Sequence, residues 1–179
     1  MKKLIFIFLF IQFLFFNIVS AKEFKSKNGY KFDLPKDYEV KESVYQGSYM
    51  TILFNKKEAD EGKNLMFIMI SKDTMATRLL STYSEVKPGD EFCNLLLQTT
   101  IEQSVNKDLK YYECTKKTKL NDKNSLKTVY DAEVRDGYLQ YQYTFELNNY
   151  LMLVSGTCKK NNCENRDNKL VALSNSIVW

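Results

Sequence analysis

The clearest pattern along the chain is a strict alternation of apolar and polar residues in its last third. Between Leu139 and Leu147 every odd-numbered residue is apolar or aromatic and every even-numbered residue is polar. A period of two predicts a β-strand with one covered face and one wetter face. The dipeptide Asp136-Gly137 predicts a tight hairpin turn from a preceding strand over 125–134. Asn148-Asn149 predicts a turn into a further, nearly all-apolar strand over 150–157.

The first part of the chain carries further strand signals. The run Tyr30–Leu34 alternates with period two and ends at Pro35, which is typical of a strand followed by a turn. The segment 64–71 is apolar on both faces, as expected of a covered central strand. The remaining predicted strands cover 48–54 and 111–118, and polar loops or turns are expected over 55–64 and 116–123.

Apolar residues at helical spacing predict two longer helices. The first is expected to begin at Asp90, and the second at about Asp167. The first helix would bury Cys93, Leu96, Leu97, Thr100, Ile101, Ser104 and Val105, and the second would bury Leu170, Leu173, Ser174 and Ile177. A shorter helix is expected over 75–83, and Trp179 is expected to pack. The order of strands, helix, antiparallel meander and helix predicts an α+β domain, with an antiparallel sheet and packed helices.

The N-terminus has the order of a secretory signal. Met1–Lys3 is basic, Leu4–Val19 is apolar apart from two polar residues, and short side chains lead to Ala21. We expect residues 1–21 to be a signal peptide and 22–179 to form a single domain. The alternative is an uncleaved anchor, but the apolar run is shorter than the ~20 residues that span a bilayer. We expect no stable membrane span after cleavage.

The cysteines agree with export. Cys93, Cys114, Cys158 and Cys163 are the four in the chain, and an even number in an oxidising compartment favours disulfides, with three pairings open. We favour Cys158–Cys163, which are close in sequence, and this leaves Cys93–Cys114. A zinc site is one alternative, but structural zinc sites prefer tighter cysteine pairs than 93 and 114. Redox-active or free thiols are another, but no C-x-x-C motif is present.

Composition excludes several classes of site. The chain of 179 residues has no histidine, so it has no His-based catalytic triad, no histidine zinc site and no imidazole pH switch. The net charge is +4, and only three of the 26 basic residues are arginines. We therefore expect no nucleic-acid partner, and the sequence contains no motif for a metal or a cofactor.

Other candidate chemistry is weak. A serine with a lysine base would need residues such as Ser71-Lys72 or Ser104–Lys107, but closeness in sequence does not make a catalytic dyad. The acidic stretch Glu58–Glu61 lacks the spacing of a calcium loop. The lysines at 116, 117, 119, 159 and 160 could touch anionic lipid headgroups, although a solvated strand edge explains them better. The aromatic face of Tyr141, Tyr143 and Phe145 is expected to be core rather than a pocket lining.

Three features together resemble the Mog1/PsbP-like superfamily, which includes the DcrB-like bacterial envelope proteins. Gly29–Tyr38 has the family's opening order of glycine-aromatic, strand, proline, turn and aromatic, with Tyr38 where Trp is frequent. The hairpin 129–147 with the strand 150–157 is similar to the central meander, and the helix ending at Ile177 is similar to the closing helix. The two cysteine pairs and the long segment 71–105 depart from the family pattern.

The resemblance implies an α/β/α sandwich around an antiparallel sheet and a role in binding, and it carries no active-site residue onto this chain. Our first hypothesis is an exported, periplasmic or secreted, non-enzymatic binding or accessory protein of the bacterial envelope. It would be stabilised by two disulfides and would contact another envelope protein through an exposed apolar patch. The alternative is a small-ligand carrier with a pocket between sheet and helices, lined by the tyrosine-rich strands. A hydrolase is a distant third, since it would need perturbed carboxylates or a lysine base converging in a cleft.

Overall fold

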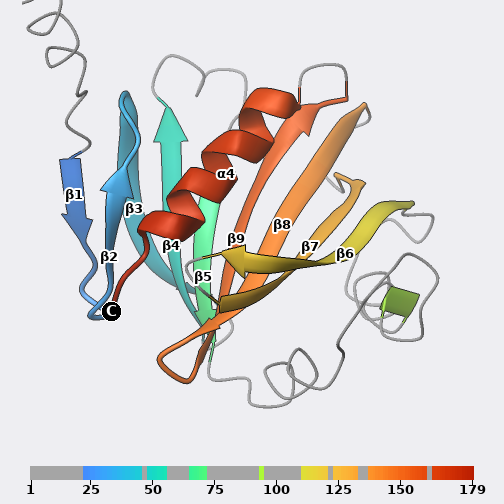
Figure 1. Cartoon of the computed structure of the whole chain (residues 1–179). Helices are drawn as coiled ribbons and strands as arrows, with labels where there is room; N and C mark the ends of the chain where they lie inside the picture. The colour runs from blue at the N-terminus through green and yellow to red at the C-terminus, as the bar shows by residue number, and fades with distance from the viewer. Residues whose placement is uncertain are drawn as a thin grey trace, which may run out of the picture.

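A seven-stranded antiparallel sheet forms the body of the protein in the computed structural model (Figure 1). Its strand order is β3-β4-β5-β9-β8-β7-β6, and a separate two-stranded sheet pairs β1 with β2. The strands are β1 (Lys22–Lys25), β2 (Lys31–Leu34), β3 (Tyr38–Tyr45), β4 (Ser48–Asn55), β5 (Met66–Ser71), β6 (Tyr111–Leu120), β7 (Lys123–Asp131), β8 (Tyr138–Leu147) and β9 (Tyr150–Lys159), and the helix is α4 (Glu164–Ser176).

The structure describes residues 22–45, 48–55, 65–71, 93–94, 110–120, 123–132, 137–160 and 163–179. The expected signal peptide at 1–21, the helix over 75–83 and most of the helix from Asp90 to Val105 lie outside the described residues. So do most of the loop 55–64 and the first residue of the Asp136-Gly137 turn.

The centre of the sheet joins segments that are far apart in sequence. β5 pairs antiparallel with β4 on one side and with β9 on the other, so that Ile68 lies opposite both Thr51 and Val154. Met66, Ile68 and Ile70 are buried, and the alternate residues of β5 are half-buried. The prediction of a central strand over 64–71 is therefore confirmed.

One face of the sheet is covered by α4 and the β1–β2 ribbon, as Figure 1 shows. The helix buries Leu170, Leu173 and Ile177 on the face predicted from its periodicity. These residues meet a core of sheet and ribbon side chains: Tyr30, Phe32, Tyr38, Leu53, Met66, Ile68, Ile70, Leu120, Tyr143, Phe145, Met152 and Val154. Burial of this apolar surface is the main stabilising term of the fold.

Gly156 shows how closely α4 approaches the sheet. A Cβ at this position would lie 3.2 Å from Arg166 Cδ, from Met66 Cγ and from the carbonyl oxygen of Leu65. The missing side chain leaves room for the buried Arg166 of α4, whose Nη1 donates a hydrogen bond to the Tyr38 hydroxyl at 3.3 Å. The sheet therefore accepts an arginine from the first turn of the helix into its core.

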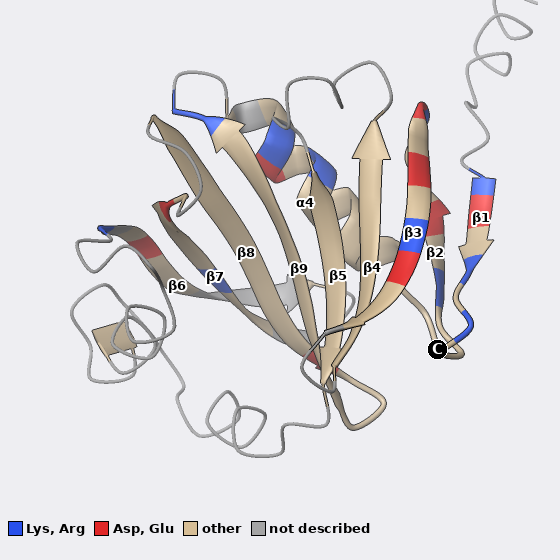
Figure 2. Cartoon of the chain, turned by 180° about the vertical axis from the view of Figure 1, so that it is seen from behind, with Lys and Arg blue, Asp and Glu red and all other residues tan. Residues whose placement is uncertain are grey.

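The opposite face of the sheet has two halves, and it is seen from behind in Figure 2. On β4, β5 and β9 the half-buried side chains are apolar: Met50, Ile52, Phe54, Phe67, Met69, Leu151 and Leu153. On β7, β8 and the second half of β9 the side chains facing the same way are mostly uncharged and polar. The predicted wetter face of β8 belongs to this polar half.

The sequence interpretation missed two strands and misplaced several boundaries. β1 and β3 were not predicted, because β1 exposes all but Phe24 and β3 is a sheet edge with alternating charged residues. β6 extends to Leu120, beyond the strand predicted over 111–118 and into the polar turn predicted over 116–123. α4 begins at Glu164, three residues before Asp167. β7 ends at Asp131 rather than 134. Edge strands lack the covered face that produces a clear hydrophobic period.

The fold is mostly antiparallel sheet with one C-terminal helix among the described residues, which agrees with the α+β prediction in its coarse form. The second layer of packed helices that an α/β/α sandwich requires is not seen in the part of the chain that the structure describes. In that same part, no helix has the length and apolar character needed to cross a membrane.

The β8–β9 turn provides a test of the hairpin geometry. Asn148 and Asn149 have φ of 51° and 62°, as in the two-residue turns that match the twist of antiparallel strands. Glycine adopts positive φ without steric cost, so we expect Asn149→Gly to stabilise the protein by up to about 1 kcal/mol. A β-branched residue is strained there, so Asn149→Val should destabilise it by about 1–2 kcal/mol. Urea unfolding of both variants measures the difference, and equal stabilities would contradict the turn geometry.

Candidate functional site

The tyrosine-rich face of β8 packs beneath α4. Tyr143 and Phe145 are fully buried, and Tyr141 packs against the same core. The Tyr143 hydroxyl donates a hydrogen bond to Asp167 of α4. Burial, followed by this carboxylate, raises the pKa of Tyr143 well above its ordinary value. These side chains therefore fill the space between sheet and helix, as the core interpretation predicts.

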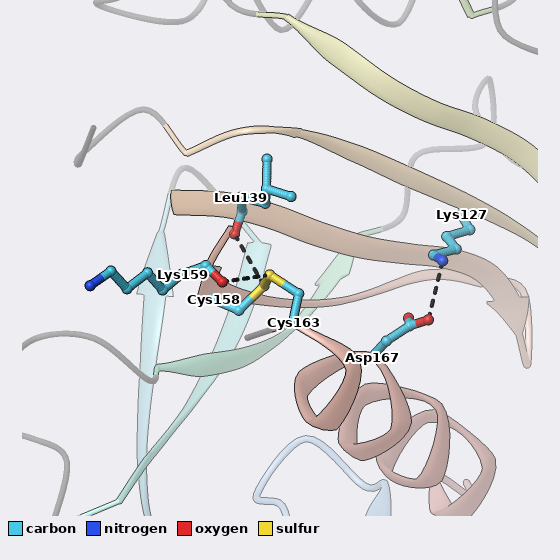
Figure 3. The surroundings of a disulfide bond; sticks show 6 residues. All are labelled: Lys127, Leu139, Cys158, Lys159, Cys163 and Asp167. Carbon is cyan, nitrogen blue, oxygen red and sulfur yellow. Dashed lines mark hydrogen bonds and ion pairs between the residues drawn. A yellow bond between two sulfur atoms is a disulfide. The ribbon is translucent and has the colours of Figure 1, made fainter. Parts of the chain in front are cut away.

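A buried lysine stands at the N-terminal end of α4. The Nζ of Lys127 on β7 lies 2.8 Å from Glu113 Oε2 on β6 and 3.2 Å from Asp167 Oδ2 on α4. Its side chain is only 8% exposed, and Nζ lies 5.2 Å from the centroid of the Tyr141 ring. Figure 3 shows Lys127 reaching across to Asp167. One charge thus connects β6, β7 and the first turns of the helix.

The electrostatics of Lys127 favour a structural role. Burial by itself lowers the pKa of the amine, but the hydrogen bond to Glu113 and the charge and hydrogen bond of Asp167 raise it by more. The net pKa lies above the ordinary value, so the amine is protonated at neutral pH. A protonated amine paired with two carboxylates cannot act as a base. Its contacts instead hold α4 on the sheet.

The four cysteines lie in two pairs, and these are the pairs that the sequence favours. Cys158 at the end of β9 is joined to Cys163, which directly precedes α4, with the Cα atoms 5.3 Å apart (Figure 3). Cys93 is joined to Cys114 of β6, with the Cα atoms 6.1 Å apart. All four residues are buried, and the described residues contain no free cysteine. The two disulfides indicate an oxidising compartment.

A second charged cluster is exposed at the rim. Lys160, inside the disulfide loop, lies 2.7 Å from Asp131 Oδ1 and donates a hydrogen bond of 3.0 Å to the Tyr112 hydroxyl, which donates to Asp131 at 2.9 Å. The hydrogen bond to Asp131 raises the pKa of Lys160 to about 12. Burial raises the pKa of Asp131, but Lys160 and Tyr112 lower it by more, to below its ordinary value. These pairs join the ends of β6, β7 and β9, and exposed pairs of this kind contribute little stability.

The other sequence candidates lie largely outside the described residues. Ser71 ends β5, whereas Lys72, Ser104–Lys107 and Glu58–Glu61 lie outside the described residues. The lysines at 116, 117 and 119 are on the edge strand β6, and their side chains are not described. Within the described residues, no group of three or more metal-ligating side chains is present.

Exposed apolar side chains gather instead at one end of the sheet, which we call the aromatic end. It comprises Val44, Tyr49, Tyr150, Val178 and Trp179. Val44 lies opposite Tyr49 in the β3–β4 hairpin and is 67% exposed, while Tyr49 is 44% exposed. Val178 and Trp179 are each 41% exposed, and the Trp179 indole stacks on the Tyr150 ring with centroids 4.6 Å apart.

Tyr30 connects the two parts of the aromatic end, the β3–β4 hairpin with Val44 and Tyr49 and the chain end with Trp179. The Trp179 ring lies 6.3 Å from the Tyr30 ring, and the Tyr30 hydroxyl is hydrogen-bonded to Thr51. Thr51 is two residues from Tyr49 and faces the same side of β4. Figure 1 shows the chain end and the β8–β9 turn at the same, lower end of the sheet.

Sequence reasoning missed the aromatic end because its residues come from three distant segments. Trp179 was expected to pack, and it does stack on Tyr150, but two-fifths of it is exposed. The unbroken odd-numbered pattern of β8 indicates buried residues, whereas Val44 and Tyr49 each follow a serine and belong to no such pattern. The contacts of Lys127 with Glu113 and Asp167 join three separate segments, so no pattern in the local sequence indicates them.

No protein-family model matches the chain, and no curated protein matches it. The fold is similar to the solution structure of cyanobacterial PsbP (CyanoP) from Synechocystis sp. PCC 6803, with a TM-score of 0.63. The match covers 90% of this chain and 94% of that chain at 11% sequence identity. Similarity at this identity shows a PsbP-like fold and no more.

Replacing Lys127 tests its role as a structural link. Lys127→Met leaves Glu113 and Asp167 close together without their shared cation, and we expect the protein to lose about 2 kcal/mol of stability. The matched control is Lys31→Met, which removes a 3.0 Å ion pair with Glu23 in which both side chains are more than two-fifths exposed. This control should change stability by less than about 0.5 kcal/mol. Urea unfolding of both variants is the measurement, and equal effects would contradict the assignment.

Removal of each disulfide tests its contribution separately. In the chain-entropy model, the double variant Cys158→Ser/Cys163→Ser should lower the free energy of unfolding by about 2 kcal/mol. The double variant Cys93→Ser/Cys114→Ser should lower it by about 3 kcal/mol, because its disulfide closes a longer loop. Unfolding of oxidised protein gives both values. Disulfide mapping of the unmodified protein should recover Cys158–Cys163 and Cys93–Cys114, and any crossed pair would refute the assigned pairing.

Proposed function

We propose that this protein is an exported, non-enzymatic accessory protein of the bacterial cell envelope that binds another envelope protein through the aromatic end. The observation that carries the proposal is the gathering of four exposed large apolar residues, Val44, Tyr49, Val178 and Trp179, at one end of the sheet. Contiguous exposed apolar groups on a soluble surface are typical of interaction sites.

The chemistry of the aromatic end suits a protein partner. Tyrosine and tryptophan are enriched at interfaces because they combine a large apolar area with a polar atom and few rotatable bonds. Trp179 is held on Tyr150 by stacking, and Val178 pairs with Lys31 of β2 through two backbone hydrogen bonds of 2.8 and 2.9 Å. A surface fixed in this way loses little conformational entropy when a partner binds.

Other features support the proposed location and role. Two disulfides fit a periplasmic or secreted protein, and the N-terminal segment has the composition of a secretory signal. The PsbP-like fold fits a binding role. So do the two described charged clusters, because their lysines are paired with carboxylates and are not available for catalysis. We also propose that the whole chain forms the α/β/α sandwich of the DcrB-like envelope proteins, beyond the PsbP-like fold seen in the described residues.

The test is crosslinking in cells of the native host, followed by gentle purification and native mass spectrometry of the tagged full-length protein. We expect an added protein mass for the unchanged chain. Val44→Glu with Tyr49→Glu should reduce the captured partner at least about thirty-fold, as expected for loss of roughly 2 kcal/mol at an interface centre.

The matched control for this experiment is Leu65→Glu. Leu65 is 43% exposed, close to the 44% of Tyr49. It directly precedes β5, at the end of that strand away from the aromatic end, so its substitution should leave capture of the partner unchanged. All variants are first compared by thermal unfolding. Equal capture by the double variant and the control would refute the aromatic end as the interface.

A further inference from the structure

The last residues of the described chain lie against the turn of the β1–β2 ribbon. Val178 pairs with Lys31 of β2 through backbone hydrogen bonds in both directions, and a Cβ on Gly29 would lie 3.8 Å from the indole nitrogen of Trp179. The ribbon turn and the chain end therefore form one surface, which we call the ribbon end. It consists of residues 25–31, Val178 and Trp179. Figure 2 shows the chain end beside the lysine-bearing turn of the ribbon.

The ribbon end concentrates positive charge. Lys25 and Lys31 lie directly opposite each other in the β1–β2 register, and Lys27 is exposed in the turn between them. Like charges directly opposite each other on two strands are destabilising. Glu23 offsets this only in part, because its carboxylate serves both lysines, at 3.0 Å from Lys31 and 3.8 Å from Lys25. An anion outside the chain would relieve the remaining repulsion.

A second carboxylate, that of Glu42 on β3, is engaged by the ribbon turn itself. It accepts hydrogen bonds from the Ser26 hydroxyl at 2.5 Å and from the Lys27 backbone nitrogen at 3.2 Å. Within the described residues, the ammonium group of Lys27 forms no ion pair. Three lysines thus face two carboxylates, which leaves an excess of positive charge on an exposed surface.

The apolar side chains beside this charge are of a kind found where a membrane meets water. Trp179 and Val178 are each 41% exposed, and one face of the indole is covered by the Tyr150 ring. Tryptophan combines a large apolar ring with an N–H donor, so it is stable at the boundary between an apolar medium and water. Lysines beside it can place their methylene stems on the apolar side and their ammonium groups on lipid phosphates. The ribbon end therefore matches an anionic bilayer surface in both charge and polarity.

We propose that the ribbon end docks peripherally on an anionic membrane surface, with Val178 and Trp179 at the level of the lipid headgroups. A lipid surface fits better than an acidic protein, because lysine is depleted in protein–protein interfaces, whereas membrane-surface sites combine lysine with tryptophan. The inference rests on the proposed function only for the partner. The hairpin part of the aromatic end, Val44 and Tyr49, is left for that partner, which would lie at the same membrane.

Trp179 is the only tryptophan of the chain, so its fluorescence reports on the ribbon end alone. The experiment is a titration of the untagged protein, purified from its native host, with vesicles of phosphatidylglycerol and phosphatidylcholine in equal amounts. Pure phosphatidylcholine vesicles are the neutral probe. We expect a saturable blue shift of the emission with the mixed vesicles and an affinity about five-fold weaker for the neutral ones, the value of one net charge at a membrane surface. Salt at about 0.5 M should remove most of this preference.

Three outcomes of the titration overturn the proposal. The first is the absence of a blue shift with the mixed vesicles, and the second is an equal affinity for both kinds of vesicle. The third concerns poly-glutamate, which serves as a protein-like anion: a shift of the Trp179 emission with poly-glutamate alone would favour an acidic protein instead of a membrane.

Lys27→Gln tests the charge without disturbing the core, because Lys27 is exposed. It should weaken binding to the mixed vesicles about three- to five-fold and leave binding to the neutral vesicles unchanged. Lys159→Gln is the matched control, since Lys159 is also exposed but lies at the end of β9 away from Tyr150. It should change neither affinity. Equal affinities of the two variants for the mixed vesicles would contradict docking through the ribbon end.

The titration contains no partner protein, so its failure is distinguishable from failure of the proposed function. Vesicle binding by a chain that captures no envelope protein would leave membrane docking standing and remove the protein interface. Capture of a partner without a blue shift on vesicles would do the reverse.

Discussion

The attachment of the first turns of α4 to the sheet is the constraint on which the rest of the structure depends. Three different interactions act within five residues: the disulfide of Cys163, the buried Arg166 over Gly156, and Asp167 with Lys127. Each connects the helix to a different strand: Cys163 to β9, Arg166 to Tyr38 of β3, and Asp167 to Lys127 of β7. The helix can therefore lie on the sheet in only one rotation and one axial position. Its apolar face then covers the core, and the chain beyond it reaches β2, where Val178 pairs with Lys31.

The local pattern of apolar and polar residues predicted the elements whose burial depends on residues nearby in the sequence. The β8–β9 hairpin and the buried stripe of α4 follow from periodicity and turn residues, and the pairing of Cys158 with Cys163 follows from their closeness. Features made by distant segments had no such signal. β3 is an edge strand with a charged sequence, Lys127 meets carboxylates from β6 and α4, and the aromatic end joins a hairpin, a turn and the last residues. These depend on the tertiary arrangement, which a period along the chain does not encode.

The two faces of the sheet have different chemistry for a physical reason. On the α4 face, buried side chains are apolar or are paired across elements, as Tyr143 is with Asp167. On the opposite face, the β7–β9 half is polar and hydrogen-bonded within the sheet itself. One face is thus apolar where α4 packs on the sheet, while the β7–β9 half of the other face pairs several of its polar groups within the sheet.

The strand order has a consequence for how the protein is made. β5 lies between β4 and β9, and its residues pair with residues of β9 that are 80 to 90 positions further along the chain, from Ser71↔Leu151 to Met66↔Gly156. Because synthesis proceeds from the N-terminus, the central pair β5–β9 cannot form until almost the entire chain has left the ribosome. The β3–β4–β5 unit is until then a small sheet with an unpaired apolar edge. The sheet can therefore be completed only at the end of translation, and the order of its strands makes the last part of the chain necessary for the pairing at its centre.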